Sequence, residues 1–114
     1  MPMTANPSLR ELQAILVKQH DALNQRLDNV TDPKTADAIV REMQEITHRM
    51  TIVGQLLFAR QSEKLQTDVG GVKKAAGRLQ DVIQKFRDTR ELLDAATDFL
   101  TLVDDAIDLA KTLT

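Results

Sequence analysis

The sequence predicts an all-α protein, built as an elongated antiparallel three-helix bundle or coiled-coil hairpin. Glycine (four residues) and proline (three) are scarce, and residues that favour helices dominate the composition. Apolar residues also recur every seven positions from Val72 to Ala110, which is the repeat of a helix packed along a seam. Eleven of the twelve seam positions are apolar: Val72, Ala75, Leu79, Val82, Phe86, Leu93, Ala96, Leu100, Val103, Ile107 and Ala110.

The first predicted helix covers residues 9–28 and follows a disordered tail at residues 1–7, which holds two prolines and little to bury. Ser8 is the predicted N-cap. Its hydroxyl can accept a hydrogen bond from the amide of Glu11, whose carboxylate reaches back in a capping box. Apolar residues then follow at helical spacing, among them Leu9, Leu12, Leu16, Leu23 and Leu27.

The second predicted helix covers residues 33–67. Asp32 followed by Pro33 is a start signal, because aspartate caps a helix and proline suits the first turn. Apolar residues then repeat at alternating steps of three and four. The Gly70–Gly71 pair is predicted to end this helix and turn the chain, because glycine readily takes a left-handed conformation.

The third predicted helix covers residues 72–113 and is the longest, at about 60 Å against about 50 Å and 30 Å for the others. Short connections make consecutive helices antiparallel, so the first helix covers only part of the other two. The flanks of the seam change from charged to apolar near Arg90. We therefore expect one domain, residues 8–114, with a three-helix body and a two-helix arm at about 56–83.

The arm carries apolar side chains that the first helix does not reach. Residues 52–59 are apolar almost all round the helix, and an uncovered apolar surface of this kind marks an interface. We expect a homodimer in which two arms meet in a four-helix layer. The residues expected at this oligomer or partner interface are Ile52, Leu56, Phe58, Ala59, Ala76 and Ile83.

The residues give little support to an enzyme. There is no cysteine, so thiolate nucleophiles and cysteine metal sites are excluded. Glu45 and His48 have the spacing of the glutamate–histidine pairs in di-metal helical bundles, but such sites need a second pair of this kind. The other histidine, His20, cannot supply it, because the residue three positions before it is Val17 and not an acid. The glycine pair lacks the Gly-Lys-Ser/Thr ending of a phosphate loop. We expect no catalytic residue, no metal and no cofactor.

The net charge of −2 is spread unevenly, with −1 over residues 1–57, +4 over 58–90 and −5 over 91–114. Basic residues near the glycine pair would form a tip that can contact phosphates, although no aromatic residue is available there to stack on bases. The basic-tip residues are Arg60, Lys64, Lys73, Lys74 and Arg78. The acidic end is expected to face water, or to pair with the basic tip of a neighbouring copy.

The expected function is that of a non-enzymatic helical protein–protein interaction module, such as an adaptor, assembly factor, chaperone or immunity-type binding protein. The alternative is an accessory nucleic-acid-binding protein that uses the basic tip of the hairpin. A membrane-surface helix pair that uses Leu56, Leu57 and Phe58 is a third class. The apolar run at residues 52–59 is too short to cross a bilayer, and the N-terminus lacks the pattern of a secretory signal. We expect a cytoplasmic protein, with leaderless secretion left open.

Overall fold

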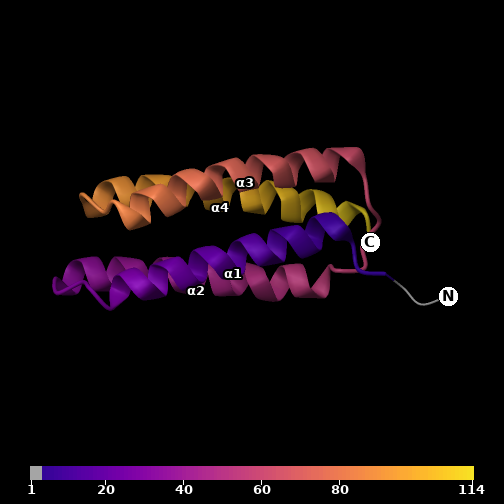
Figure 1. Ribbon diagram of the computed structural model, residues 1–114. Coiled ribbons are helices and arrows are strands. Elements are labelled where there is room, and N and C mark those ends of the chain that lie inside the picture. Colours follow the sequence, from indigo (N-terminus) through magenta and orange to yellow (C-terminus); the bar gives the residue numbers. More distant parts are fainter. Residues whose placement is uncertain (1–3) are drawn as a thin grey trace.

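The computed structural model describes residues 4–114, and these residues form four α-helices and no strand. The helices lie side by side in an elongated bundle of 52 × 21 × 17 Å (Figure 1). The predicted all-α fold is confirmed. The predicted number of three helices is wrong for the described residues. The helices are α1 (Pro7–Leu27), α2 (Pro33–Gln55), α3 (Glu63–Gln84) and α4 (Thr89–Thr112).

The helices alternate in direction along the chain. The turns at residues 28–32 and 85–88 lie at one end of the bundle, and the connection at residues 56–62 lies at the other end beside the C-terminus (Figure 1). α1 packs against α2 and α3, and α4 packs against the same two helices. α1 and α4 therefore occupy opposite corners of the bundle, and so do α2 and α3.

The Gly70–Gly71 pair does not turn the chain, because it lies inside α3. Neither glycine has a positive φ. Val69 and Val72 beside them are buried in the core. The free energy gained by this burial outweighs the cost of placing glycine in a helix, which is about 1 kcal/mol per residue relative to alanine. The predicted second helix, 33–67, is therefore wrong beyond residue 55. The chain turns at residues 56–62 instead.

Side-chain caps mark the starts of α3 and α4. The Ser62 hydroxyl accepts a hydrogen bond from the amide of Leu65 at 3.0 Å and caps α3. The Asp88 carboxylate accepts from the amide of Glu91 at 2.7 Å and caps α4. The predicted third helix over 72–113, whose continuity near Arg90 the sequence left open, is therefore two helices, because the chain breaks at residues 85–88. The heptad repeat runs through this break because the seam on both sides faces one shared core.

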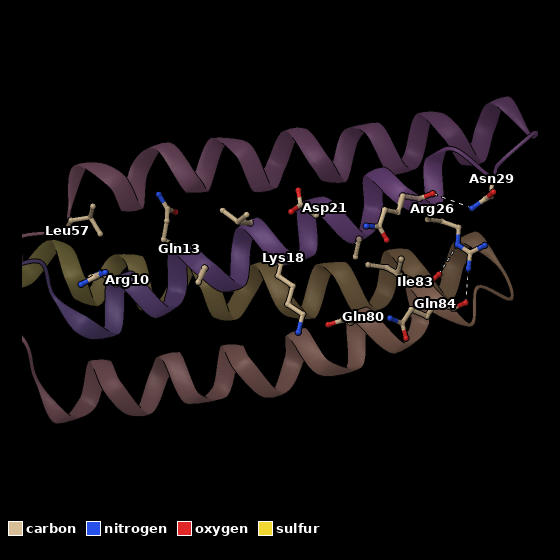
Figure 2. Close-up of a pocket in the computed structure, with 14 residues that line it drawn as sticks. Arg10, Gln13, Lys18, Asp21, Arg26, Asn29, Leu57, Gln80, Ile83 and Gln84 are labelled. Carbon is tan, nitrogen blue, oxygen red and sulfur yellow. Dashed lines mark hydrogen bonds between the residues drawn. The ribbon is translucent and has the colours of Figure 1, made fainter.

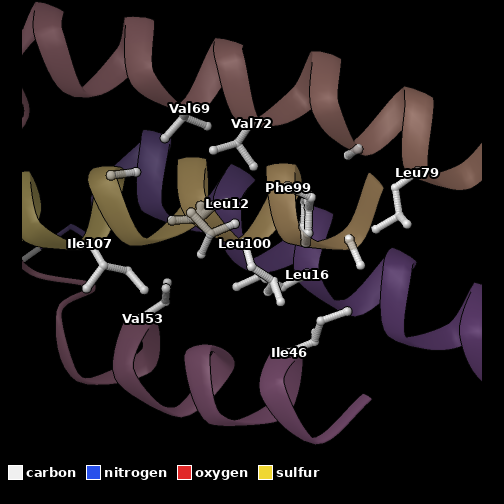
Figure 3. Packing of buried hydrophobic residues seen from close by; sticks show 14 of the residues in the cluster. Leu12, Leu16, Ile46, Val53, Val69, Val72, Leu79, Phe99, Leu100 and Ile107 are labelled. Atoms are coloured by element: carbon white, nitrogen blue, oxygen red, sulfur yellow. The ribbon is translucent and has the colours of Figure 1, made fainter. Parts of the chain in front are cut away.

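That core runs the length of the bundle, and every helix contributes to it (Figure 3). Phe99 is the largest of the fully buried side chains. α4 buries the widest stripe, which agrees with the change from charged to apolar flanks seen near Arg90 in the sequence. The labelled core residues of Figure 3 are Leu12, Leu16, Ile46, Val53, Val69, Val72, Leu79, Phe99, Leu100 and Ile107.

Asn6 ties the start of α1 to the connection at the same end of the bundle. Its side-chain oxygen accepts hydrogen bonds from the amides of Ser8 and Leu9 at 2.9 and 3.1 Å. Its Nδ2 donates to the carbonyl of Ala59 at 3.0 Å, and its backbone amide donates to the carbonyl of Leu57 at 2.6 Å.

These contacts of Asn6, which we call the Asn6 clamp, show that the domain starts earlier than predicted. Asn6 is 3% exposed and is the N-cap of α1 in place of Ser8. Pro7 is already helical, so the predicted disordered tail at residues 1–7 is too long. Residues 1–3 lie outside the described part of the chain.

No helix among the described residues is both long enough and apolar enough to span a membrane.

Replacing Asn6 by alanine should lower the free energy of unfolding by about 2 kcal/mol. About half of this is the lost cap, and the rest is the buried Ala59 carbonyl left without its donor. Urea denaturation measures the change. Ser62→Ala is the control, since it removes a cap alone and should cost about 1 kcal/mol. Equal losses for the two variants would contradict the clamp.

Alanine at Gly70 or Gly77 should stabilise the protein by roughly 0.5–1 kcal/mol each. Both glycines lie inside α3, and an added Cβ would meet no atom within 4 Å at either position. The two sites are about 10 Å apart along the helix, so thermal denaturation should show nearly additive gains for the double variant. A loss of stability would reveal a structural requirement for glycine there.

Candidate functional site

A groove of about 860 Å³ runs along the outer face of α1 and is bordered by the end of α3 and by Leu57 of the connection (Figure 2). Its lining extends from Arg10, near the connection, to Asn29, at the opposite end of α1. This distance is about 29 Å at the rise of an α-helix. α3 contributes the end of the groove beside Ile83, and the connection contributes Leu57 at the other end.

Short side chains on α1 form the floor of the groove. The floor is lined by Ala14, Val17 and Ala22, so the surface of α1 is low between the longer side chains on either side. Val17 is 39% exposed, which is unusual for a large apolar residue in this chain. Only Val40, Phe58 and Leu102 are comparable among the described residues. The floor therefore offers apolar contact to a ligand.

Amide side chains form much of the rim. Gln13 is fixed by a hydrogen bond from its Nε2 to the carbonyl of Met50 at 2.9 Å, and its buried Oε1 has no partner within residues 4–114. Asn29 donates weakly to the carbonyl of Gln25, at 3.4 Å. Such amides can donate to and accept from a ligand backbone or side chains without adding charge. The amides that line the groove are Gln13, Gln25, Asn29, Gln80 and Gln84.

The charges of the groove are mostly positive. Arg10 and Lys18 line it and have no ion pair within residues 4–114. Asp21 is the acidic residue of the lining, and its carboxylate lies 3.8 Å from the imidazole of His20. Two cations are therefore available to an acidic ligand.

Arg26, the third basic residue of the lining, has a structural task. Its Nε and Nη2 donate to the carbonyls of Ile83 and Gln84 at 2.9 and 2.7 Å. Its guanidinium carbon lies 5.8 Å from the ring centroid of Phe86. These contacts satisfy the last carbonyls of α3 and hold one wall of the groove against α1.

Half of the residues of the predicted interface lie in the core of their own chain. Ala59, Ala76 and Ile83 are buried, because the α3–α4 break gives the bundle the extra helix that a second copy was expected to supply. Ile52 and Leu56 are half-buried and pack against that core. Phe58 is 58% exposed, beside the Leu57 end of the groove. Of the predicted interface residues, Phe58 is the large apolar side chain left open.

The residues of the predicted basic tip do not gather at one end. Lys64, Lys73, Lys74 and Arg78 are spread along about 21 Å of α3, because the glycine pair does not turn the chain. Lys64 pairs with Asp68 at 3.3 Å, Lys73 with Glu11 at 3.9 Å and Arg78 with Asp98 at 2.6 Å. Arg60, in the connection, donates to the carbonyl of Leu113.

The acidic end of the chain lies on α4 and is only partly neutralised. Asp98 pairs with Arg78, and Asp104 forms two hydrogen bonds with Arg49 at 2.7 and 3.0 Å. Other aspartates of α4 are exposed and have no ion pair within residues 4–114. They are Asp94, Asp105 and Asp108.

Glu45 and His48, considered above as half of a metal site, do not come together with other ligands. The Glu45 carboxylate accepts a hydrogen bond from Arg49 at 2.8 Å. No group of three or more metal-ligating side chains occurs in the described residues. His20 lies at the edge of the core and is half-buried.

The α2–α4 seam contains polar groups. Thr35 and Thr89 share a hydrogen bond at 2.9 Å near one end, and Arg49 bridges to Asp104 further along. Burial lowers the pKa of Arg49, but its hydrogen-bonded carboxylates more than offset this, so the pKa is raised. Between these contacts lies Glu42, whose buried Oε2 has no hydrogen-bond partner among the described residues.

The groove was not predicted from the sequence. Its one available signal was Val17, an apolar residue on the polar side of α1. The walls from α3 and the connection could not be anticipated, because they come from residues more than forty positions away in the sequence.

No known protein family, curated protein or solved structure matches the chain.

Replacing Glu42 by glutamine should stabilise the protein at neutral pH. Burial and the neighbouring Glu45 raise the pKa of Glu42, and Arg49 lowers it only in part. The folded state therefore holds this proton more tightly than the unfolded chain. Stability falls as pH rises from the ordinary value of 4.5 towards the raised pKa. The variant should melt higher than the parent at pH 7 and almost equally near pH 3.

Glu45→Gln is the control for this experiment, because Glu45 accepts a hydrogen bond from Arg49 instead of lying unpaired. This variant should melt at or below the parent temperature at pH 7. A lower melting temperature for Glu42→Gln at pH 7 would contradict the role given to Glu42.

Proposed function

We propose that the protein is a non-enzymatic interaction module that receives an α-helix in the groove along α1. The observation that carries this proposal is the groove itself, which extends for about 29 Å along α1 and the turn after it and has an apolar floor over about 12 Å of that length, from Ala14 to Ala22. A ligand helix of about 19 residues has the full length of the groove. Its residues at positions i, i+3, i+4 and i+7 would lie on Ala14, Val17 and Ala22.

The rim supports the same function. Amides and two unpaired cations border the apolar floor, and interfaces of this kind combine an apolar centre with a polar edge. No serine, threonine, cysteine or histidine lines the groove, so its walls carry no hydroxyl, thiol or imidazole nucleophile. Adaptor, assembly, chaperone and immunity-type proteins are all consistent with a helix-binding groove.

Self-association belongs to this proposal, but through a different surface from the one expected from the sequence. The bundle covers Ala59, Ala76 and Ile83 without a second copy. The groove and the exposed Phe58 are the surfaces that a second copy or another protein would cover. The location that belongs to this proposal is the cytoplasm, and the absence of cysteine is compatible with that reducing compartment.

Nucleic-acid binding through the predicted basic tip has less support. The basic side chains of α3 are spread along the helix, and three of them pair with carboxylates. A surface that binds phosphates by counterion release needs a concentrated positive patch.

A photo-crosslinking amino acid at Val17 should capture a helical partner in the groove. The same amino acid at Val40 is the matched control, because both valines are exposed on helices, at 39% and 37%, and Val40 lies outside the groove. Mass spectrometry should identify one discrete crosslinked protein from position 17 and not from position 40.

Calorimetry with that purified partner then completes the test. Val17→Glu should weaken binding at least tenfold, since a buried carboxylate faces the apolar stripe of the ligand, while Val40→Glu should leave affinity unchanged. Equal crosslinking at both positions, or equal affinity for both glutamate variants, would refute the groove as the binding site.

A further inference from the structure

We propose that the helix received by the groove is α4 of a second copy of this chain, an inference that rests on the proposed function. The outer face of α4 points away from α1, because the two helices occupy opposite corners of the bundle (Figure 1). Each copy therefore presents a groove at one corner and an acidic helix at the opposite corner.

Charge complementarity is the first argument. α4 carries six acidic and two basic side chains, and Asp94, Asp105 and Asp108 are exposed with no ion pair in the described residues. The groove offers Arg10 and Lys18, which are also unpaired. These cations and aspartates have no ion pair within one copy and would pair between copies. Such pairing would set the register and orientation of α4 in the groove.

Apolar complementarity is the second argument. Large apolar side chains that are more than a third exposed are few in the described residues, and two of them lie on these two surfaces. Val17 on the groove floor is 39% exposed, and Leu102 on the outer face of α4 is 37% exposed. Docking α4 in the groove buries both together.

An antiparallel alignment satisfies both arguments at once. With Val17 opposite Leu102, Arg10 lies opposite Leu109 and next to Asp108. Lys18 then lies opposite Thr101, within about one helical turn of Asp105. The opposite polarity of the helices also places the positive end of each macrodipole beside the negative end of the other.

One like-charge contact in this alignment is already compensated. Asp21 on the groove falls opposite Asp98, and two carboxylates alone would repel. Asp98 is paired with Arg78 of its own copy at 2.6 Å. The positive charge of Arg78 therefore offsets the repulsion between Asp98 and Asp21.

The contact is heterologous, because the groove and the acidic face are different surfaces of one molecule. Docking one pair leaves a groove open at one end and an α4 open at the other, so further copies can add in a row. A single helix in a shallow groove is a small interface, and a dissociation constant on the order of 100 μM is expected. Added salt should weaken the association, since exposed charges carry part of it.

Two charge-reversal variants test the arrangement. The groove variant combines Arg10→Glu with Lys18→Glu, and the α4 variant combines Asp105→Lys with Asp108→Lys. The substituted side chains are exposed, and circular dichroism with thermal melting verifies that both variants fold as the parent does. Sedimentation velocity from about 10 μM to about 1 mM then gives the mass of each sample.

The parent should gain mass with concentration, and each variant alone should stay a monomer. An equimolar mixture should regain the association of the parent, because the intact groove of one variant binds the intact α4 of the other, and the acidic groove and basic α4 that remain also carry opposite charges. A parent that stays monomeric, variants that associate as the parent does, or a mixture that stays monomeric would each overturn the proposal. A homodimer through Phe58 would persist in both variants and would also overturn it.

The result is separable from the test of the proposed function. If the mixture stays monomeric while position 17 crosslinks to a different protein, the groove binds a helix and only the identity of that helix is wrong. If position 17 crosslinks to α4 of a second copy, both proposals stand.

Discussion

Burial of one continuous apolar seam is the constraint on which the whole bundle depends. Each helix has an apolar stripe that water would otherwise contact, and packing the stripes together is the dominant favourable term in folding. Burial around Val69 and Val72 keeps α3 helical through its glycines. The same seam aligns α4 with α3 after the break at residues 85–88, so the heptad register survives a reversal of chain direction.

Polar contacts at the two ends of the bundle then fix how the helices meet. At one end Asn6 holds the start of α1 to the carbonyls of Leu57 and Ala59. At the other end Arg26 satisfies the last carbonyls of α3. Both contacts join α1 to distant parts of the chain, and they bring Leu57 and Ile83 to the two ends of the groove. The framework and the candidate site therefore share residues, and Arg26 belongs to both.

The distribution of surface charge follows from the same arrangement. Because α1 and α4 occupy opposite corners, the cations of the groove and the free aspartates of α4 face in opposite directions and do not neutralise one another within a copy. The basic side chains of α3 lie between these corners, and several are held by neighbouring carboxylates. A separation of this kind suits recognition between molecules, where complementary charge sets orientation.

The sequence by itself determined that the protein is helical, that Asp32 caps helix α2 ahead of Pro33, and that most of the seam positions from Val72 to Ala110 are buried. These properties depend on periodicity and capping, which act within a few residues. The positions of the turns required the tertiary structure. Gly70–Gly71 had the stronger local turn signal, but a turn there would have removed Val69 and Val72 from the core, whereas Ser62 and Asp88 cap helices whose seams remain buried. The groove was likewise decided by tertiary packing, because α1 and the turn after it supply most of its lining, but the rest comes from α3 and the connection, which meet α1 only when the core forms.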